Sequence, residues 1–137
     1  MTTDEFRRES IRLFMEKADE ALRAAHQIRE TSPSTAVSRS YYACFYAASA
    51  VLLVEGRKFV KHATLRGALH KLLVRTGRFS KGLAAEYGKL LVARHQADYE
   101  ATIQWSPSDV DQAIRAAETV VAALRELLPP ADSEGNP

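Results

Sequence analysis

The chain has 137 residues, of which 46% are hydrophobic and 26% charged, which fits one folded domain and excludes a disordered or collagen-like chain. A single cysteine, Cys44, excludes an intrachain disulfide and a multi-cysteine metal site. No apolar run reaches the ~20 residues of a membrane span, and the acidic start lacks the order of a signal peptide, so we expect a cytoplasmic protein without a membrane segment.

The first two helices are expected to pack closely along their length. Residues from about 4 to 30 carry apolar side chains at steps of three and four, several of them alanines that permit close helix–helix approach. Thr2 and Glu5 have the spacing of a capping box, which starts a helix. A second helix from Ser32-Pro33 to Gly56 is apolar on nearly every side, which predicts the central helix of a bundle.

Three further helices complete the predicted fold. A short helix is expected over about residues 63–75, a longer one from Ser80 to about 102, and a last one from Ser106-Pro107 to the stop at Pro129-Pro130. Together they predict an all-α protein, an up-and-down four-helix bundle with an additional short helix. Residues 1–128 form the single predicted domain, and residues 129–137 a disordered C-terminal tail.

Positive charge is concentrated in one segment. Between residues 57 and 81 there are eight basic residues and no acidic one, whereas the rest of the chain has 11 basic and 17 acidic residues. Such a block is the electrostatic footprint of a site for phosphate groups. Lys61, His62 and Arg66 are therefore predicted to contact a nucleotide or RNA. Two alternatives stay open: a surface for an acidic protein partner, and a basic surface that serves solubility alone.

The fourth predicted helix places charged residues where its buried stripe should continue. The steps of three and four set by Leu83, Tyr87 and Leu90 lead to Arg94 and Asp98. Burying these charges costs several kcal/mol unless they are paired, and a spacing of four residues allows a pair. Either this pair is structural, or Arg94 presents its fork-shaped guanidinium to a phosphate in a polar pocket.

Arg39 is a further cation, on an otherwise nearly uncharged helix. It needs a partner, for which Asp98 is a candidate, and Tyr42 lies three residues further on the same helix face. Arg39, Tyr42, Arg94 and Asp98 are therefore predicted to bind a ligand. The histidines show no close metal spacing and no glycine-rich phosphate loop is present, so neither a metal nor a cofactor is expected.

Short segments in a fixed order carry a family resemblance. They are Met15-Glu16-Lys17-Ala18-Asp19-Glu20-Ala21-Leu22, Ser38-Arg39-Ser40-Tyr41-Tyr42-Ala43-Cys44-Phe45, Leu53-Val54-Glu55-Gly56, Lys61-His62 and Arg94-His95-Gln96-Ala97-Asp98-Tyr99. Over about residues 4–128 they resemble the HEPN domain, named for higher eukaryotes and prokaryotes nucleotide-binding, in its short stand-alone prokaryotic branch. The resemblance implies a helical bundle that commonly forms a homodimer. It also implies frequent pairing with a minimal nucleotidyltransferase, often as a toxin–antitoxin system.

Many members of this family are metal-independent ribonucleases with an arginine, a polar residue and a histidine on one helix. Arg94 matches the arginine and His95 the polar position, while Tyr99 stands where the histidine is expected. Tyrosine, with a pKa of about 10, is a poor general base at pH 7. The resemblance therefore implies a protein that binds nucleotide or RNA phosphate and a nucleotidyltransferase partner. The alternatives are a ribonuclease toxin that uses Arg94, His95 and Tyr99, and a purely structural dimer.

Overall fold

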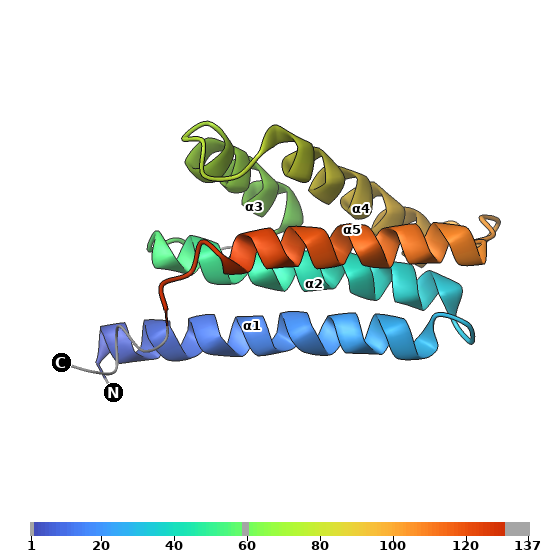
Figure 1. Ribbon diagram of the computed structural model, residues 1–137, viewed down its shortest axis with the longest axis horizontal. Coiled ribbons are helices and arrows are strands. Elements are labelled where there is room, and N and C mark those ends of the chain that lie inside the picture. Colours follow the sequence, from blue (N-terminus) through green and yellow to red (C-terminus); the bar gives the residue numbers. More distant parts are fainter. Residues whose placement is uncertain (1, 59–60, 131–137) are drawn as a thin grey trace.

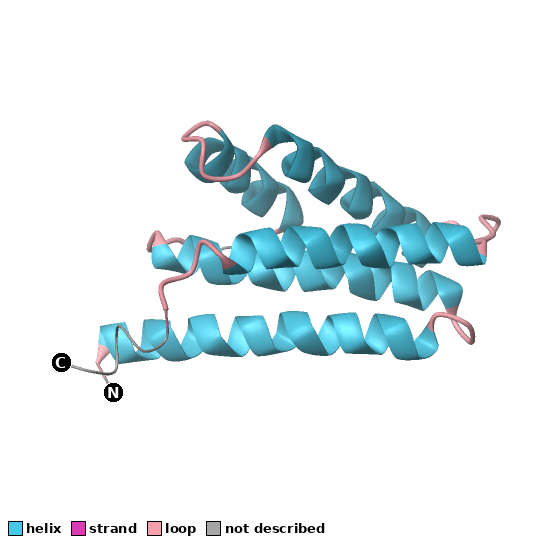
Figure 2. Cartoon of the chain, viewed as in Figure 1, coloured by secondary structure: helices cyan, strands magenta, loops and turns pink. Residues whose placement is uncertain are grey.

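The described part of the chain consists of helices joined by turns and loops, and it confirms the all-α prediction. The computed structural model describes residues 2–58 and 61–130, and these ranges contain no strand. The helices are α1 (Thr3–Ile28), α2 (Pro33–Val54), α3 (His62–Leu69), α4 (Lys81–Tyr99) and α5 (Pro107–Arg125), shown in Figures 1 and 2. The segment 131–137 of the predicted tail lies outside the described residues.

Side-chain caps start three of the helices where the sequence predicts them. The Thr2 hydroxyl accepts a hydrogen bond from the backbone N–H of Glu5 at 3.1 Å. The Ser80 hydroxyl accepts one from Leu83 at 3.1 Å, and Ser106 forms a complete capping box with Asp109. Ser32 precedes α2 but does not cap it through its side chain, because its hydroxyl donates to Thr35 instead.

The predicted third helix changes its geometry part of the way along. After α3 the chain continues as a π-helical turn, η1 (His70–Val74), in which the N–H of Arg75 donates to the carbonyl of His70 at 2.9 Å. In this wider turn Leu73 and Val74 are both buried although they are adjacent in sequence. Gly77 follows with a φ of 81°, a left-handed conformation that suits glycine and ends the helix.

The centre of the bundle is α2. It packs against α1, α4 and α5, and in Figure 1 α3 and α4 lie on the opposite side of α2 from α1. Buried alanines of α1, such as Ala18, Ala21 and Ala25, let α1 lie close to α2 along most of its length. The predicted central position of α2 is thus confirmed.

One helix among the described residues, α2, is long and apolar enough to cross a membrane by length and composition alone. In the most apolar window of α2, 67% of the residues are buried inside the bundle. That burial is typical of the core helix of a folded domain, and the packing of α2 against α1, α3, α4 and α5 accounts for its composition.

Candidate functional site

Arg94 of α4 turns inward onto aromatic rings of α2. Its side chain is only 13% exposed. The guanidinium carbon lies 5.6 Å from the ring centre of Tyr41 and 5.9 Å from that of Tyr42, which are cation–π distances. The predicted core-type position of Arg94 is therefore what the structure shows.

The charge of Arg94 is only partly compensated. Nη1 of Arg94 lies 3.5 Å from Oδ2 of Asp98, a long ion pair, and the Asp98 side chain is 29% exposed. Nε of Arg94 is buried and meets no hydrogen-bond partner in the described part of the chain. A buried guanidinium donor without an acceptor is costly, so the hydrogen-bonding capacity of Arg94 is incompletely satisfied.

Arg39 and Arg94 both lie near the ring of Tyr42, but among the described residues they do not share a carboxylate. The guanidinium carbon of Arg39 lies 4.7 Å from the ring centre of Tyr42. Asp98 was a candidate partner for Arg39, but in the described part of the chain it pairs with Arg94, and Arg39 lies over Tyr42. Arg39, Tyr41, Tyr42, His62, Arg94 and Asp98 are called the Arg94 cluster below.

His62 joins the cluster from the first turn of α3. Its Nδ1 lies 2.7 Å from the Tyr41 hydroxyl, and its ring centre lies 4.5 Å from that of Phe45. Burial and the neighbouring Arg94 guanidinium lower the pKa of His62 below the usual 6.5. His62 is therefore largely neutral at pH 7, where it offers one ring nitrogen as a donor and one as an acceptor.

The lowered pKa of His62 predicts a loss of stability in acid. Between pH 6.5 and the lower pKa that His62 has in the folded protein, His62 binds more protons in the unfolded chain than in the folded one. The free energy of unfolding therefore falls as the pH falls through this range. We expect the melting temperature to drop more between about pH 7.5 and 5 in the wild type than in His62→Gln. His70→Gln, which changes an exposed histidine, is the control. An equal drop in melting temperature in the wild type and His62→Gln would show that His62 does not cause the loss of stability in acid.

The predicted basic block divides into residues near the cluster and residues used elsewhere. Arg66 of α3 lies against Gly88 of α4, so closely that an added Cβ at Gly88 would collide with the guanidinium. Lys61 is exposed directly before α3, beside His62. Arg78 instead pairs with Glu55 and donates to the carbonyl of Leu72, which holds the end of η1 to α2. The eight cations therefore do not form one free surface.

The three residues predicted to act together in a ribonuclease are not brought together within one chain. His95 and Tyr99 are exposed, and their ring centres lie 5.0 Å apart. The Arg94 guanidinium lies instead over the rings of Tyr41 and Tyr42 on α2. Tyr41 was not predicted as a site residue, because a buried tyrosine in an apolar helix looks the same as core.

Comparison with known proteins shows which family the chain belongs to. The HEPN domain profile matches residues 11–127, which include every residue of the Arg94 cluster. The chain belongs to the HEPN family. The "UPF0332 protein" of Thermotoga maritima is 35% identical to this HEPN chain over 94 residues, 69% of this chain and 71% of the relative.

Two further relatives come from Methanocaldococcus jannaschii. "Putative toxin MJ0142" is 31% identical to this HEPN chain over 115 residues, 83% of this chain and 78% of the relative. "Putative toxin MJ0605" is 30% identical over 125 residues, 88% of this chain and 93% of the relative. Both matches cover most of this chain and most of the relative. The similarity therefore concerns the whole bundle rather than one segment.

Proposed function

We propose that this HEPN protein binds a phosphate group of a nucleotide or RNA at Arg94, in a toxin-like role. The observation that carries the proposal is the nearly buried Arg94, with a free Nε and a single carboxylate at 3.5 Å. Arg39 adds a second cation beside the same tyrosine ring. Two guanidinium groups and one carboxylate leave one surplus positive charge, which a phosphate would neutralise with paired hydrogen bonds.

The surroundings of Arg94 suit a nucleotide better than an isolated anion. Tyr42 is half-buried and its ring centre lies close to both guanidinium groups (4.7 and 5.9 Å), so the exposed part of the ring could contact a base beside the phosphate. Lys61 and Arg66 on or beside α3 are exposed and would contact further phosphates of a longer RNA. The names of the two Methanocaldococcus relatives support the toxin-like part of the proposal.

Reversing the exposed charges of α3 and η1 tests this electrostatic contribution. The triple variant Arg66→Glu, Lys71→Glu, Arg75→Glu should bind a labelled oligoribonucleotide at least about ten-fold more weakly than the wild type, with a shallower salt dependence. All three residues are exposed, so the melting temperature should change little. The control triple variant reverses Arg23, Lys89 and Arg115 on other helices. Equal losses in both variants, or salt-independent wild-type binding, would contradict the proposed site.

We also infer that the protein forms a homodimer through α4. Val92 and Tyr99 of α4 are 55% and 68% exposed, on the helix that holds Arg94. Sedimentation at micromolar concentration should give a dimer for the wild type and a weaker dimer for the double variant Val92→Ser, Tyr99→Ser. The exposed pair Phe6→Ser, Leu13→Ser on α1 is the control. A wild-type monomer, or a dimer that both pairs weaken equally, would contradict an α4 interface.

A minimal nucleotidyltransferase is the protein partner that we propose for this chain, and the cytoplasm its location. Both rest on membership of the HEPN family and on the toxin names of two relatives. Co-purification from the native host, followed by mass spectrometry, tests the partner directly. If the chain is recovered from its own host without any nucleotidyltransferase, the pairing is wrong.

A metal-independent ribonuclease is the second candidate. It is favoured by the names of the two relatives and by the position of His95 directly after Arg94. Cleavage of RNA in the presence of a chelator, lost in Arg94→Ala, would support the enzyme. If RNA stays intact over hours with the purified wild type, the ribonuclease hypothesis is wrong and only the phosphate-binding proposal remains.

A further inference from the structure

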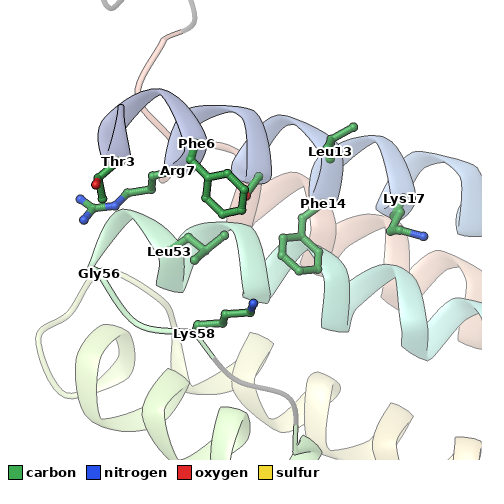
Figure 3. Close-up of a pocket in the computed structure, with 10 residues that line it drawn as sticks. Thr3, Phe6, Arg7, Leu13, Phe14, Lys17, Leu53, Gly56 and Lys58 are labelled. Carbon is green, nitrogen blue, oxygen red and sulfur yellow. The ribbon is translucent and has the colours of Figure 1, made fainter. Parts of the chain in front are cut away.

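A groove lies between the N-terminal half of α1 and the C-terminal end of α2 (Figure 3). It encloses about 400 Å³, and none of its lining residues belongs to the Arg94 cluster. Phe6 and Phe14 from α1 and Leu53 from α2 form much of its apolar surface. The groove is therefore a feature separate from the proposed phosphate site.

The face of α1 along this groove is only partly covered by the described residues. The lining residues of α1 recur at steps of three and four and so share one helix face: Thr3, Phe6, Arg7, Ser10, Leu13, Phe14 and Lys17. Phe6 is 63% exposed and Leu13 is 44% exposed. In Figure 1 the start of α1 extends past the ends of α2 and α5, so this face meets little of the bundle. Clustered exposed apolar side chains of this kind mark an interaction surface.

The charge on the groove has one sign. Arg7, Lys17 and Lys58 line it, and among the residues that the structure describes no acidic one does. Two carboxylates on the same stretch of α1, those of Glu9 and Glu16, are engaged by Arg12. A partner that fits this surface therefore brings negative charge together with apolar side chains.

We propose that the groove binds an acidic amphipathic segment of a partner protein. Apolar side chains of that segment would lie between Phe6, Phe14 and Leu53, and its carboxylates would meet the three cations. A protein segment lying along the groove would cover the exposed Phe6 and Leu13 and reach all three cations at once. A membrane surface fits less well, because the apolar surface here is concave rather than protruding.

A designed peptide tests this docking surface. The probe is a fluorescent helical peptide of roughly 15 residues, with leucine and phenylalanine on one face and glutamate on the other. The groove variants are the pairs Phe6→Ala with Leu13→Ala and Arg7→Glu with Lys58→Glu. The matched controls are Ile103→Ala, a partly exposed apolar residue between α4 and α5, and the pair Arg23→Glu with Arg115→Glu.

Micromolar binding to the wild type is expected, weakened at least about ten-fold by each groove variant and by neither control. Arg94→Ala should bind the peptide as the wild type does, so this test is independent of the phosphate site. No binding up to millimolar peptide, or equal binding to the groove variants, would overturn the proposal. Self-association that Phe6→Ala with Leu13→Ala abolishes would assign the groove to a second copy of the chain. Binding to anionic vesicles without peptide binding would assign it to a membrane.

Discussion

Arg94→Ala should weaken binding of a labelled oligoribonucleotide at least about ten-fold, because a charged hydrogen bond contributes roughly 1.5–3 kcal/mol. The guanidinium is held in place before any ligand arrives, by the rings of Tyr41 and Tyr42 and by Asp98. Little conformational freedom would therefore be lost on binding, and most of the interaction energy would appear as affinity. Fluorescence anisotropy at fixed ionic strength measures the change.

Two further variants separate the shape of the guanidinium from its charge. Arg94→Lys should lose nearly as much affinity as Arg94→Ala, because an ammonium cannot form two parallel hydrogen bonds to one phosphate. Asp98→Asn should bind at least as tightly as the wild type, because it removes the carboxylate that competes for Arg94 at 3.5 Å. Full affinity in Arg94→Lys, or a large loss in Asp98→Asn, would indicate that the Arg94–Asp98 pair is structural and does not bind phosphate.

The helices were predictable from local signals that the structure confirms. Apolar residues at steps of three and four predict α1 and α5, and the caps at Thr2, Ser80 and Ser106 predict where three helices begin. Arg94 could also be predicted, since the same periodicity leads from Tyr87 and Leu90 to a charged residue in a buried stripe. These signals depend on residues within a few positions of one another, and a single sequence contains that information.

Contacts between distant segments were not predictable in the same way. The hydrogen bond between Tyr41 and His62 joins residues 21 positions apart, and it depends on how α3 meets α2. By charge, Arg39 of α2 could pair with Asp98 of α4, and only the way in which the two helices meet decides that Asp98 pairs with Arg94 while Arg39 lies over Tyr42 of its own helix. The groove beside Phe6 could not be predicted from the sequence either. Its apolar residues continue the same helical periodicity that predicts the core, so they look like core residues.

Tyr41→Ala should lower the free energy of unfolding by about 3–5 kcal/mol, a large part of the stability of a small domain. Tyr41 is fully buried and joins three elements, because its ring contacts His62 of α3 and Tyr87 of α4 from its place on α2. Burial raises the pKa of Tyr41 to about 12, so its hydroxyl stays protonated at neutral pH and continues to bond to His62. Removing the whole side chain would leave a cavity between α2, α3 and α4.

Tyr41→Phe keeps the ring and removes only the hydroxyl, so it should cost about 1 kcal/mol, the usual contribution of one hydrogen bond. Because the ring under Arg94 remains, oligoribonucleotide affinity should stay within about three-fold of the wild type. Tyr46→Ala, at a half-buried tyrosine of the same helix, is the control and should cost less than Tyr41→Ala. Urea unfolding measures all three. If Tyr41→Ala is no more destabilising than Tyr46→Ala, Tyr41 does not hold α3 and α4 to α2, and the Arg94 cluster would owe its arrangement to other contacts.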